Sequence, residues 1–532
     1  MSASATAANA PEPPRRATGS RSRPVALGAI CLVLFLTFLD TTIISVGLGG
    51  IQGDLEAGVV SLQWVVNGYA LAFAGLLLVG GSIGDLLGRR RVMIAGIVVF
   101  LVGSVVSALA GSVGMLVAGR IVMGVGAAFC EPGTLSLLRQ LFPKERSRAR
   151  ALGAWTAVSG LALALGPVVG GLLVAAGSWR TIFWFNLVLG AVALVAAVIA
   201  LPDSADREGR RLDVAGAVLG AGWVTLLTYA VISGEREGFT TTRILALFAA
   251  AVVALVLFVI VELVVRDPLV DLRFFRSPTF AAANLVGFFT YFGLFAVFFF
   301  TALYLQSVPG KSAGQLAEQF APMALGMILA AALAGRWVGS IGPKVPMTVG
   351  CLLAAGGIAW TDSLLAPDVA YLPLAASLLV AGVGFATALV PVTSAALTAV
   401  PGRRSGMAAS VSNATRQLGA VVAIAVLGAI VNSALDGGLQ RRLVDLGVPG
   451  PLRDYVGNLV REGGVPDTRS VENFPPPLRP LVQQILDTAY AAFGDGLHTC
   501  FTIAAILLLA GAVVAALAVR HGTVQRDEHD GA

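Results

Sequence analysis

The amino-acid sequence predicts an all-α polytopic membrane protein with about fourteen transmembrane helices. Of its 532 residues, 57% are hydrophobic and only 12% are charged, and its mean hydropathy is +0.85. Apolar runs of roughly 17–25 residues, each long enough to cross a bilayer as a helix, recur along the whole chain. These observations exclude a water-soluble globular protein.

The apolar runs divide the chain into two bundles of six helices with two further helices between them. The runs begin near residues 25, 61, 92, 114, 151, 181, 214, 243, 280, 319, 347, 371, 407 and 495. The expected parts are a cytoplasmic tail at 1–24, an N-terminal bundle at 25–201, two inserted helices with flanking loops at 202–268, a C-terminal bundle at 269–519 that includes a polar external loop at 432–494, and a cytoplasmic tail at 520–532. The first run lacks a cleavage site followed by a soluble domain, so it is expected to remain as a helix.

The basic residues indicate how the chain is oriented in the cell membrane. Most of the 36 Lys and Arg residues fall in the two tails and in the loops on the same side. Because basic loops stay in the cytoplasm, both termini are predicted to be cytoplasmic. The net charge of +6 then reflects this loop bias, and no nucleic-acid partner is expected.

The sequence gives no sign of a metal site or of enzymatic chemistry. The four cysteines each lie within or at the end of an apolar run, without the spacing of a disulfide framework or a metal site. No ATP-binding loop and no arrangement of a catalytic nucleophile is recognisable. The chain is therefore not expected to be an enzyme or to hold a cofactor.

One charged turn occurs twice. Gly81–Gly96, with the sequence GSIGDLLGRRRVMIAG, matches Gly335–Gly350, GRWVGSIGPKVPMTVG, at an offset of 254 residues. Each copy joins two apolar runs, which implies two halves with the same order of helices. Only the first copy is charged at its centre, because Gly339 stands where Asp85 would be. A simple membrane anchor needs only the arginines of such a turn.

Four segments together resemble the major facilitator superfamily, in its fourteen-helix drug:proton antiporter branch. Gly81–Arg91 resembles the loop signature of the superfamily, and Arg120–Ala128 resembles its fourth-helix motif. Leu39–Leu48 resembles the first-helix signature of the branch, and Gly160–Gly171 resembles the antiporter signature of helix five. The resemblance implies two six-helix bundles plus two inserted central helices, and it implies proton-coupled export.

Three charged residues inside the membrane are the candidates for proton coupling. Asp40 lies about 12 Å from the outer end of its helix and Arg120 about 9 Å from the outer end of its own, at 1.5 Å per residue. Because the depths match, the two side chains are expected to face each other. Glu131 lies about 16 Å along the helix from Arg120, so those two cannot pair directly unless Pro132 kinks the helix. The alternative is structural: Asp40 and Arg120 form a static ion pair, and Glu131 bonds a backbone carbonyl exposed by Pro132.

The resemblance also implies a conformational latch and a hinge. The latch consists of Gly81, Asp85, Gly88, Arg89 and Arg90, of which Asp85 and Arg89 would clamp the two halves together. The hinge consists of Gly166, Pro167, Gly170 and Gly171. Ordinary close packing of small residues would produce a similar composition for the hinge.

Aromatic and amide side chains on helices two and nine are predicted to line a substrate cavity, because such faces suit large, flat and cationic molecules. The candidates are Trp64, Asn67, Asn284, Phe288 and Tyr291, with Phe292 on the same helix and Arg416 in a later one. The function expected is efflux of small amphipathic drugs or antibiotics, cationic ones among them, by a monomer in the lipid bilayer, driven by the proton gradient. The alternatives are a dedicated exporter of one natural product, lipid or siderophore, and a non-transporting receptor or passive facilitator.

Overall fold

The computed structural model describes residues 22–142, 145–202, 213–265, 268–366, 368–400, 405–445 and 479–519. Every regular element within these residues is a helix, so the predicted all-α class is confirmed. Fourteen stretches of the described chain are long and apolar enough to cross a membrane, as the sequence predicts. Most of the two predicted tails, at 1–24 and 520–532, lies outside the described residues.

The helices of the first half and of the inserted pair are α1 (Ser22–Ile43), η1 (Ile44–Gly47), α2 (Leu48–Leu55), α3 (Val59–Leu87), α4 (Arg89–Ala108), α5 (Val113–Leu141), α6 (Glu145–Ala176), α7 (Arg180–Ala200), α8 (Val214–Glu237) and α9 (Thr242–Val264). The second half contains η2 (Leu272–Arg276), α10 (Pro278–Ala296), η3 (Val297–Thr301), α11 (Ala302–Ser307), α12 (Ala313–Ile341), α13 (Lys344–Leu364), α14 (Tyr371–Thr398), α15 (Ser405–Asp445) and α17 (Arg479–Ala518). The segment α1–η1–α2 forms one membrane span, and α10–η3–α11 forms another.

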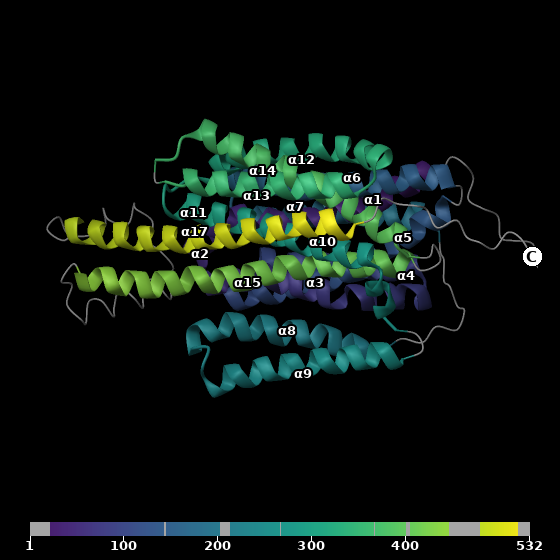
Figure 1. Cartoon of the computed structure of the whole chain (residues 1–532), viewed down its shortest axis with the longest axis horizontal. Coiled ribbons are helices and arrows are strands. Elements are labelled where there is room, and N and C mark those ends of the chain that lie inside the picture. The colour runs from purple at the N-terminus through teal and green to yellow at the C-terminus, as the bar shows by residue number, and fades with distance from the viewer. Residues whose placement is uncertain are drawn as a thin grey trace, which may run out of the picture.

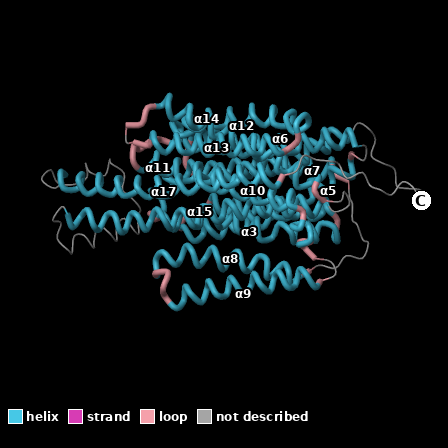
Figure 2. Tube along the Cα trace, in the orientation of Figure 1, coloured by secondary structure: helices cyan, strands magenta, loops and turns pink. Residues whose placement is uncertain are grey.

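The helices lie side by side along the long axis of the molecule, and loops join them at its two ends (Figures 1 and 2). The two halves meet mainly where α3 packs on α15 and where α6 packs on α12. We call the end at which α1 begins and α17 ends the terminus side, and the opposite end the far side. Helices α8 and α9 form a separate pair along one edge, where α8 packs on α3 and α15 and α9 lies outermost (Figure 1).

The turn that the sequence predicts twice is present in both halves. Gly88 ends α3 with φ 104°, and Gly342 ends α12 with φ 79°. A residue with a side chain is strained at such positive φ values, which explains why both copies retain glycine. The next helix begins at Arg89 in the first copy and at Lys344 in the second.

The segment 432–494, predicted to be a polar external loop, is helical at both of its described ends. Helix α15 continues as far as Asp445, and α17 begins at Arg479, well before the start predicted near residue 495. The two helices project together beyond the rest of the bundle (Figure 1). Polar residues do not prevent a helix from continuing, since a helix already satisfies its backbone groups. Residues 446–478 lie outside the described chain.

Candidate functional site

The first part of the site is an ion pair between α1 and α5. Arg120 Nη1 lies 2.5 Å from Asp40 Oδ2, and both side chains are 0% exposed. Arg120 Nε donates to the carbonyl oxygen of Val65 at 3.1 Å, and its guanidinium carbon lies 4.5 Å from the ring centroid of Tyr69. Asn186 Nδ2 donates to Asp40 Oδ1 at 2.6 Å. The expected pairing is therefore present, and three helices besides α1 contribute to it.

Close helix packing explains how Arg120 reaches its partners. A Cβ atom at Gly124, one turn further along α5, would collide with the carbonyl oxygen of Tyr69 on α3. Because glycine has no Cβ, the backbones of α3 and α5 approach closely at this point. The guanidinium of Arg120 can then contact the backbone of α3 and the Tyr69 ring while it holds the carboxylate from α1.

The second part of the site connects the two halves. Glu131 on α5 is 1% exposed, and its Oε1 accepts a hydrogen bond from Asn413 Nδ2 on α15. Glu131 Oε2 has no hydrogen-bond partner among the described residues. Arg416, one turn beyond Asn413, interacts electrostatically with Glu131. The alternative in which Glu131 bonds a carbonyl exposed by Pro132 does not describe this contact, because the partner is a side chain of the other half.

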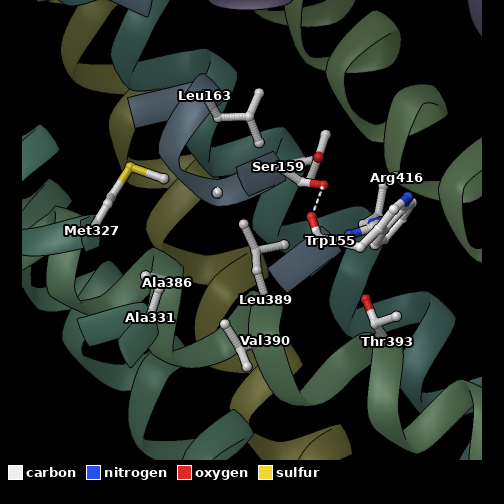
Figure 3. Close-up of a pocket in the computed structure, with 12 residues that line it drawn as sticks. Trp155, Ser159, Leu163, Met327, Ala331, Ala386, Leu389, Val390, Thr393 and Arg416 are labelled. Atoms are coloured by element: carbon white, nitrogen blue, oxygen red, sulfur yellow. Dashed lines mark hydrogen bonds between the residues drawn. The ribbon is translucent and has the colours of Figure 1, made fainter. Parts of the chain in front are cut away.

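A small cavity lies between the halves beside this contact, and Figure 3 shows the residues around it. Trp155, Ser159 and Leu163 of α6 line one side, and residues of α10, α12, α14 and α15 line the other, including Arg416. Its volume is about 30 Å³, whereas pockets for drug-sized ligands measure about 300–1,000 Å³. The halves must therefore separate before such a molecule can enter.

Polar groups are placed along the α6 wall of the cavity. Trp155 Nε1 donates to Thr134 Oγ1 of α5 at 2.9 Å, and Ser159 Oγ donates to the carbonyl oxygen of Trp155 at 2.9 Å (Figure 3). On the opposite wall, the guanidinium carbon of Arg416 lies 5.6 Å from the ring centroid of Tyr291. The cavity thus combines apolar walls with an arginine and hydroxyl groups.

Of the residues predicted to line the cavity, Tyr291 and Arg416 do so. Trp64 instead packs on Tyr229 of α8, with ring centroids 5.8 Å apart. Asn284 donates to the carbonyl oxygen of Phe280 in its own helix at 2.8 Å. The face of α3 that carries Trp64 is turned toward the inserted pair, so the prediction for this residue is wrong in this conformation.

Three other residues predicted to line the cavity, Asn67, Phe288 and Phe292, are not among the residues of its wall. The ring of Phe288 packs against Phe289 and Phe292, at centroid distances of 5.9 and 6.5 Å. Asn67 is fully buried, and neither polar atom of its side chain has a hydrogen-bond partner in the described chain. Helix α6, the fifth membrane span, contributes Trp155, Ser159 and Leu163 to the cavity wall.

The predicted hinge glycines of α6 face two different neighbours. A Cβ atom at Gly166 would collide with Thr42 of α1, and one at Gly170 would lie 2.6 Å from the carbonyl oxygen of Ile43. A Cβ atom at Gly171 would lie 2.5 Å from the carbonyl oxygen of Ala313 on α12, in the other half. Gly166 and Gly170 therefore hold α6 to its own half, on either side of Pro167, and Gly171 joins it to the other half at the far side.

The structure describes contacts for two of the predicted latch residues, Gly81 and Arg90. The side chain of Asp85 lies outside the described residues. Arg90 Nη2 donates to the carbonyl oxygen of Val198 on α7 at 2.5 Å, within the same half. Gly81 approaches the second half, since a Cβ atom there would lie 3.9 Å from Ser410 Oγ of α15.

Asn186, Asn413 and Trp155 belong to the site but were not predicted from the sequence. Asn413 lies three residues before Arg416, on the same face of α15, and this spacing is the signal that would have indicated it. Asn186 is a single amide in an apolar helix, which is costly in a membrane unless it has a partner. Trp155 carries no comparable signal, because tryptophan also occurs on lipid-facing surfaces.

Comparisons with known proteins agree with this architecture. The family model described as "Major Facilitator Superfamily" matches residues 30–424. The chain is 32% identical to "Multidrug resistance protein Stp" of Mycobacterium tuberculosis over 82% of this chain and 81% of the relative. It is 31% identical to "Tetracenomycin C resistance and export protein" of Streptomyces glaucescens over 94% of this chain and 92% of the relative. The methylenomycin A resistance protein of Bacillus subtilis is 34% identical over 76% of this chain and 87% of the relative.

Among solved structures, a bacterial homolog of the human lysosomal transporter Spinster, in an inward-facing and unoccupied conformation, superposes with a TM-score of 0.62. The match covers 95% of this chain and 98% of that chain, at 19% sequence identity. The human organic anion transporter MFSD10 superposes with a TM-score of 0.57 over 93% and 99% of the two chains, at 17% identity. At these identities the comparison establishes the shared fold.

Proposed function

The chain belongs to the major facilitator superfamily, and we propose that it exports small amphipathic compounds, cationic drugs or antibiotics among them, in exchange for protons. The observation that carries the proposal is the contact of Glu131 with Asn413, because it places a buried carboxylate between the two halves. The cavity beside this contact is lined by Arg416 from the same helix as Asn413.

Protonation of Glu131 would change the attraction between the halves. The ionised carboxylate attracts α15 through the charge of Arg416 and accepts a hydrogen bond from Asn413. A protonated carboxyl loses the charge attraction, and a charged hydrogen bond is roughly twice as strong as a neutral one. Proton binding therefore favours separation of α5 from α15 at the terminus side, and proton release favours closure.

Asp40 is a second buried acid, and it differs from Glu131 because its described partners all lie within the first half. Its carboxylate is held by Arg120 and Asn186 inside the first half, away from the contact between halves. Helix α1 carries Asp40 and packs on α6, whose Gly171 meets α12. Protonation of Asp40 would loosen α1 from α5 and so change the surface that α6 presents to the second half.

The remaining features of the proposal follow from the same scheme. Export from the cytoplasm requires that the terminus side faces the cytoplasm, in agreement with the basic loops. The proton gradient is the only energy source, and neither a cofactor nor a metal ion takes part. The chain acts as a monomer, because the cavity is enclosed by the two halves of one chain.

Export of a single natural product is the second candidate, and the names of two relatives favour it. One relative is a resistance and export protein for tetracenomycin C, and another is a resistance protein for methylenomycin A. Competition distinguishes the two candidates: several chemically unrelated compounds inhibit export by a multidrug transporter, whereas a dedicated exporter responds only to close analogues of one compound. A receptor or passive facilitator would move no compound against its concentration gradient.

Transport by purified protein in liposomes tests the proposal. A pH gradient is imposed, and accumulation of a fluorescent cation such as ethidium is measured for the parent and for Asp40→Asn and Glu131→Gln. Asp54→Asn is the matched control, because Asp54 also pairs with an arginine, Arg180, but is 47% exposed. We expect gradient-driven accumulation by the parent and the control and its loss in the other two variants. Equal accumulation by all four proteins would refute the coupling roles.

A further inference from the structure

A second group of buried acids lies outside the central cavity, at the terminus side of the inserted helix pair. Asp213 precedes α8 and is 7% exposed, and Glu262 near the end of α9 is 4% exposed. Asp213 Oδ1 accepts from the backbone nitrogen of Gly216 at 2.8 Å, and Glu262 Oε2 accepts from the backbone nitrogen of Val270 at 3.0 Å. Each carboxylate thus uses one oxygen to fix the local backbone.

The other oxygen of each acid has no hydrogen-bond partner of normal geometry in the described part of the chain. The backbone of Leu269 also interacts with the Glu262 carboxylate. The other oxygens of the two acids face the same small space above Gly216. A Cβ atom on Gly216 would collide with Asp213 Oδ2 and would lie 2.8 Å from Glu262 Oε1. Two buried acceptors that converge on one point, without a hydrogen-bond donor between them, are costly unless a donor or a cation joins them.

An apolar cavity of about 170 Å³ adjoins this point. Gly216 and Val270, the two residues whose backbones hold the acids, are part of its wall. The cavity continues between the inserted pair and the bundle, where Trp223, Phe258 and Leu418 line it. A dry cavity of about 150 Å³ accommodates benzene, so this one has room for a phenyl ring.

We propose that Asp213 and Glu262 bind the ammonium group of a small amphipathic amine whose apolar part occupies the cavity between α8, α9 and the bundle. The amine would donate one N–H to Asp213 Oδ2 and another to Glu262 Oε1, and its positive charge would compensate the two carboxylates. The ligand must therefore carry N–H donors, which distinguishes a protonated primary amine from a quaternary ammonium ion. This site is separate from the central cavity and does not depend on proton-coupled export.

Equilibrium binding of tritiated phenethylamine to the purified full-length protein in detergent tests the proposal. Saturable binding by the parent is expected. Glu262→Gln and Asp213→Asn, which retain the size of each side chain, are each expected to weaken binding by about ten- to a hundredfold, the worth of a hydrogen bond to a charged group. Gly216→Ala, which places a methyl group between the acids, is expected to weaken it similarly without changing any charge.

Matched controls lie on the same helix pair. Glu237→Gln removes an acid at the other end of α8, where it pairs with Arg243, and Gly222→Ala adds a methyl group where no atom lies within 4 Å. Both controls are expected to bind phenethylamine like the parent. Trimethylated phenethylammonium and the neutral 2-phenylethanol are expected to compete weakly.

Several results would overturn the proposal. These are the absence of saturable binding to the parent, equal affinity in the parent and the three site variants, and competition by the trimethylated probe as strong as that of phenethylamine itself. Because the assay measures binding alone, its failure leaves the transport experiment unaffected.

Discussion

Replacing Arg120 by methionine removes the positive charge that compensates Asp40 and leaves a side chain of similar length. The arginine contributes an ion pair at 2.5 Å, a hydrogen bond to Val65 and a contact with the Tyr69 ring, all at a site that is 0% exposed. Once it is removed, the described partner of the Asp40 side chain is the amide of Asn186. Removing one member of a buried ion pair typically costs about 3–5 kcal/mol of folding free energy.

A double-mutant cycle separates this cost from the lost packing. Arg120→Met should unfold at a lower temperature than the parent, and Asp40→Asn combined with Arg120→Met should recover much of the difference, because no uncompensated charge remains. The midpoints are measured by size-exclusion chromatography of detergent-solubilised protein after heating. Asp40→Asn alone completes the cycle: if the loss in the double variant equals the sum of the losses in the two single variants, the side chains are not energetically coupled and the argument for an ion pair fails.

Four further predictions extend the test. Glu131→Gln should abolish gradient-driven accumulation in liposomes while exchange of labelled compound without a gradient continues; loss of both activities would indicate a structural role instead. Gly171→Leu should block transport by holding α6 away from α12. Gly153→Leu, on the same helix at a position with no atom within 4 Å of an added Cβ, should be tolerated, and equal inhibition by both variants would contradict the packing argument. Asp85→Asn should leave membrane insertion, measured by surface labelling, unchanged and should reduce transport, measured by efflux. Full transport activity would show that the turn serves only as a membrane anchor. Trp155→Phe removes the hydrogen bond to α5, which is worth about 1 kcal/mol. The variant should change how strongly different compounds inhibit export relative to one another, and an unchanged pattern of inhibition would show that Trp155 does not contact the substrate.

The depth of a residue in the membrane could be read from the sequence. A helix rises by a fixed amount per residue, so Asp40 and Arg120 could be placed at matching depths by counting. The positions of Gly88 and Gly342 followed from the repeat, since both end a helix with a positive φ. These predictions depend only on distances along the chain.

The rotation of a helix about its axis could not be read in the same way. In a soluble protein the polar face shows which side is exposed, but in a membrane both the lipid-facing and the buried faces are apolar. Trp64 was therefore assigned to the cavity although it faces α8, and Leu389 of α14, which lines the cavity, carried no signal. The contact of Glu131 with Asn413 joins residues 282 positions apart, and neither amide nor acid indicates its partner on its own.

Proton release from the purified parent protein on addition of a transported cation shows directly whether Glu131 carries the exchanged proton. The protein is held in weakly buffered detergent solution with a pH indicator, and Glu131→Gln and Asp54→Asn are measured beside it. We expect that the parent and Asp54→Asn release protons in proportion to bound cation and that Glu131→Gln releases fewer. Equal release by the parent and by Glu131→Gln, at equal binding, would contradict the proposal that this carboxyl group carries the exchanged proton.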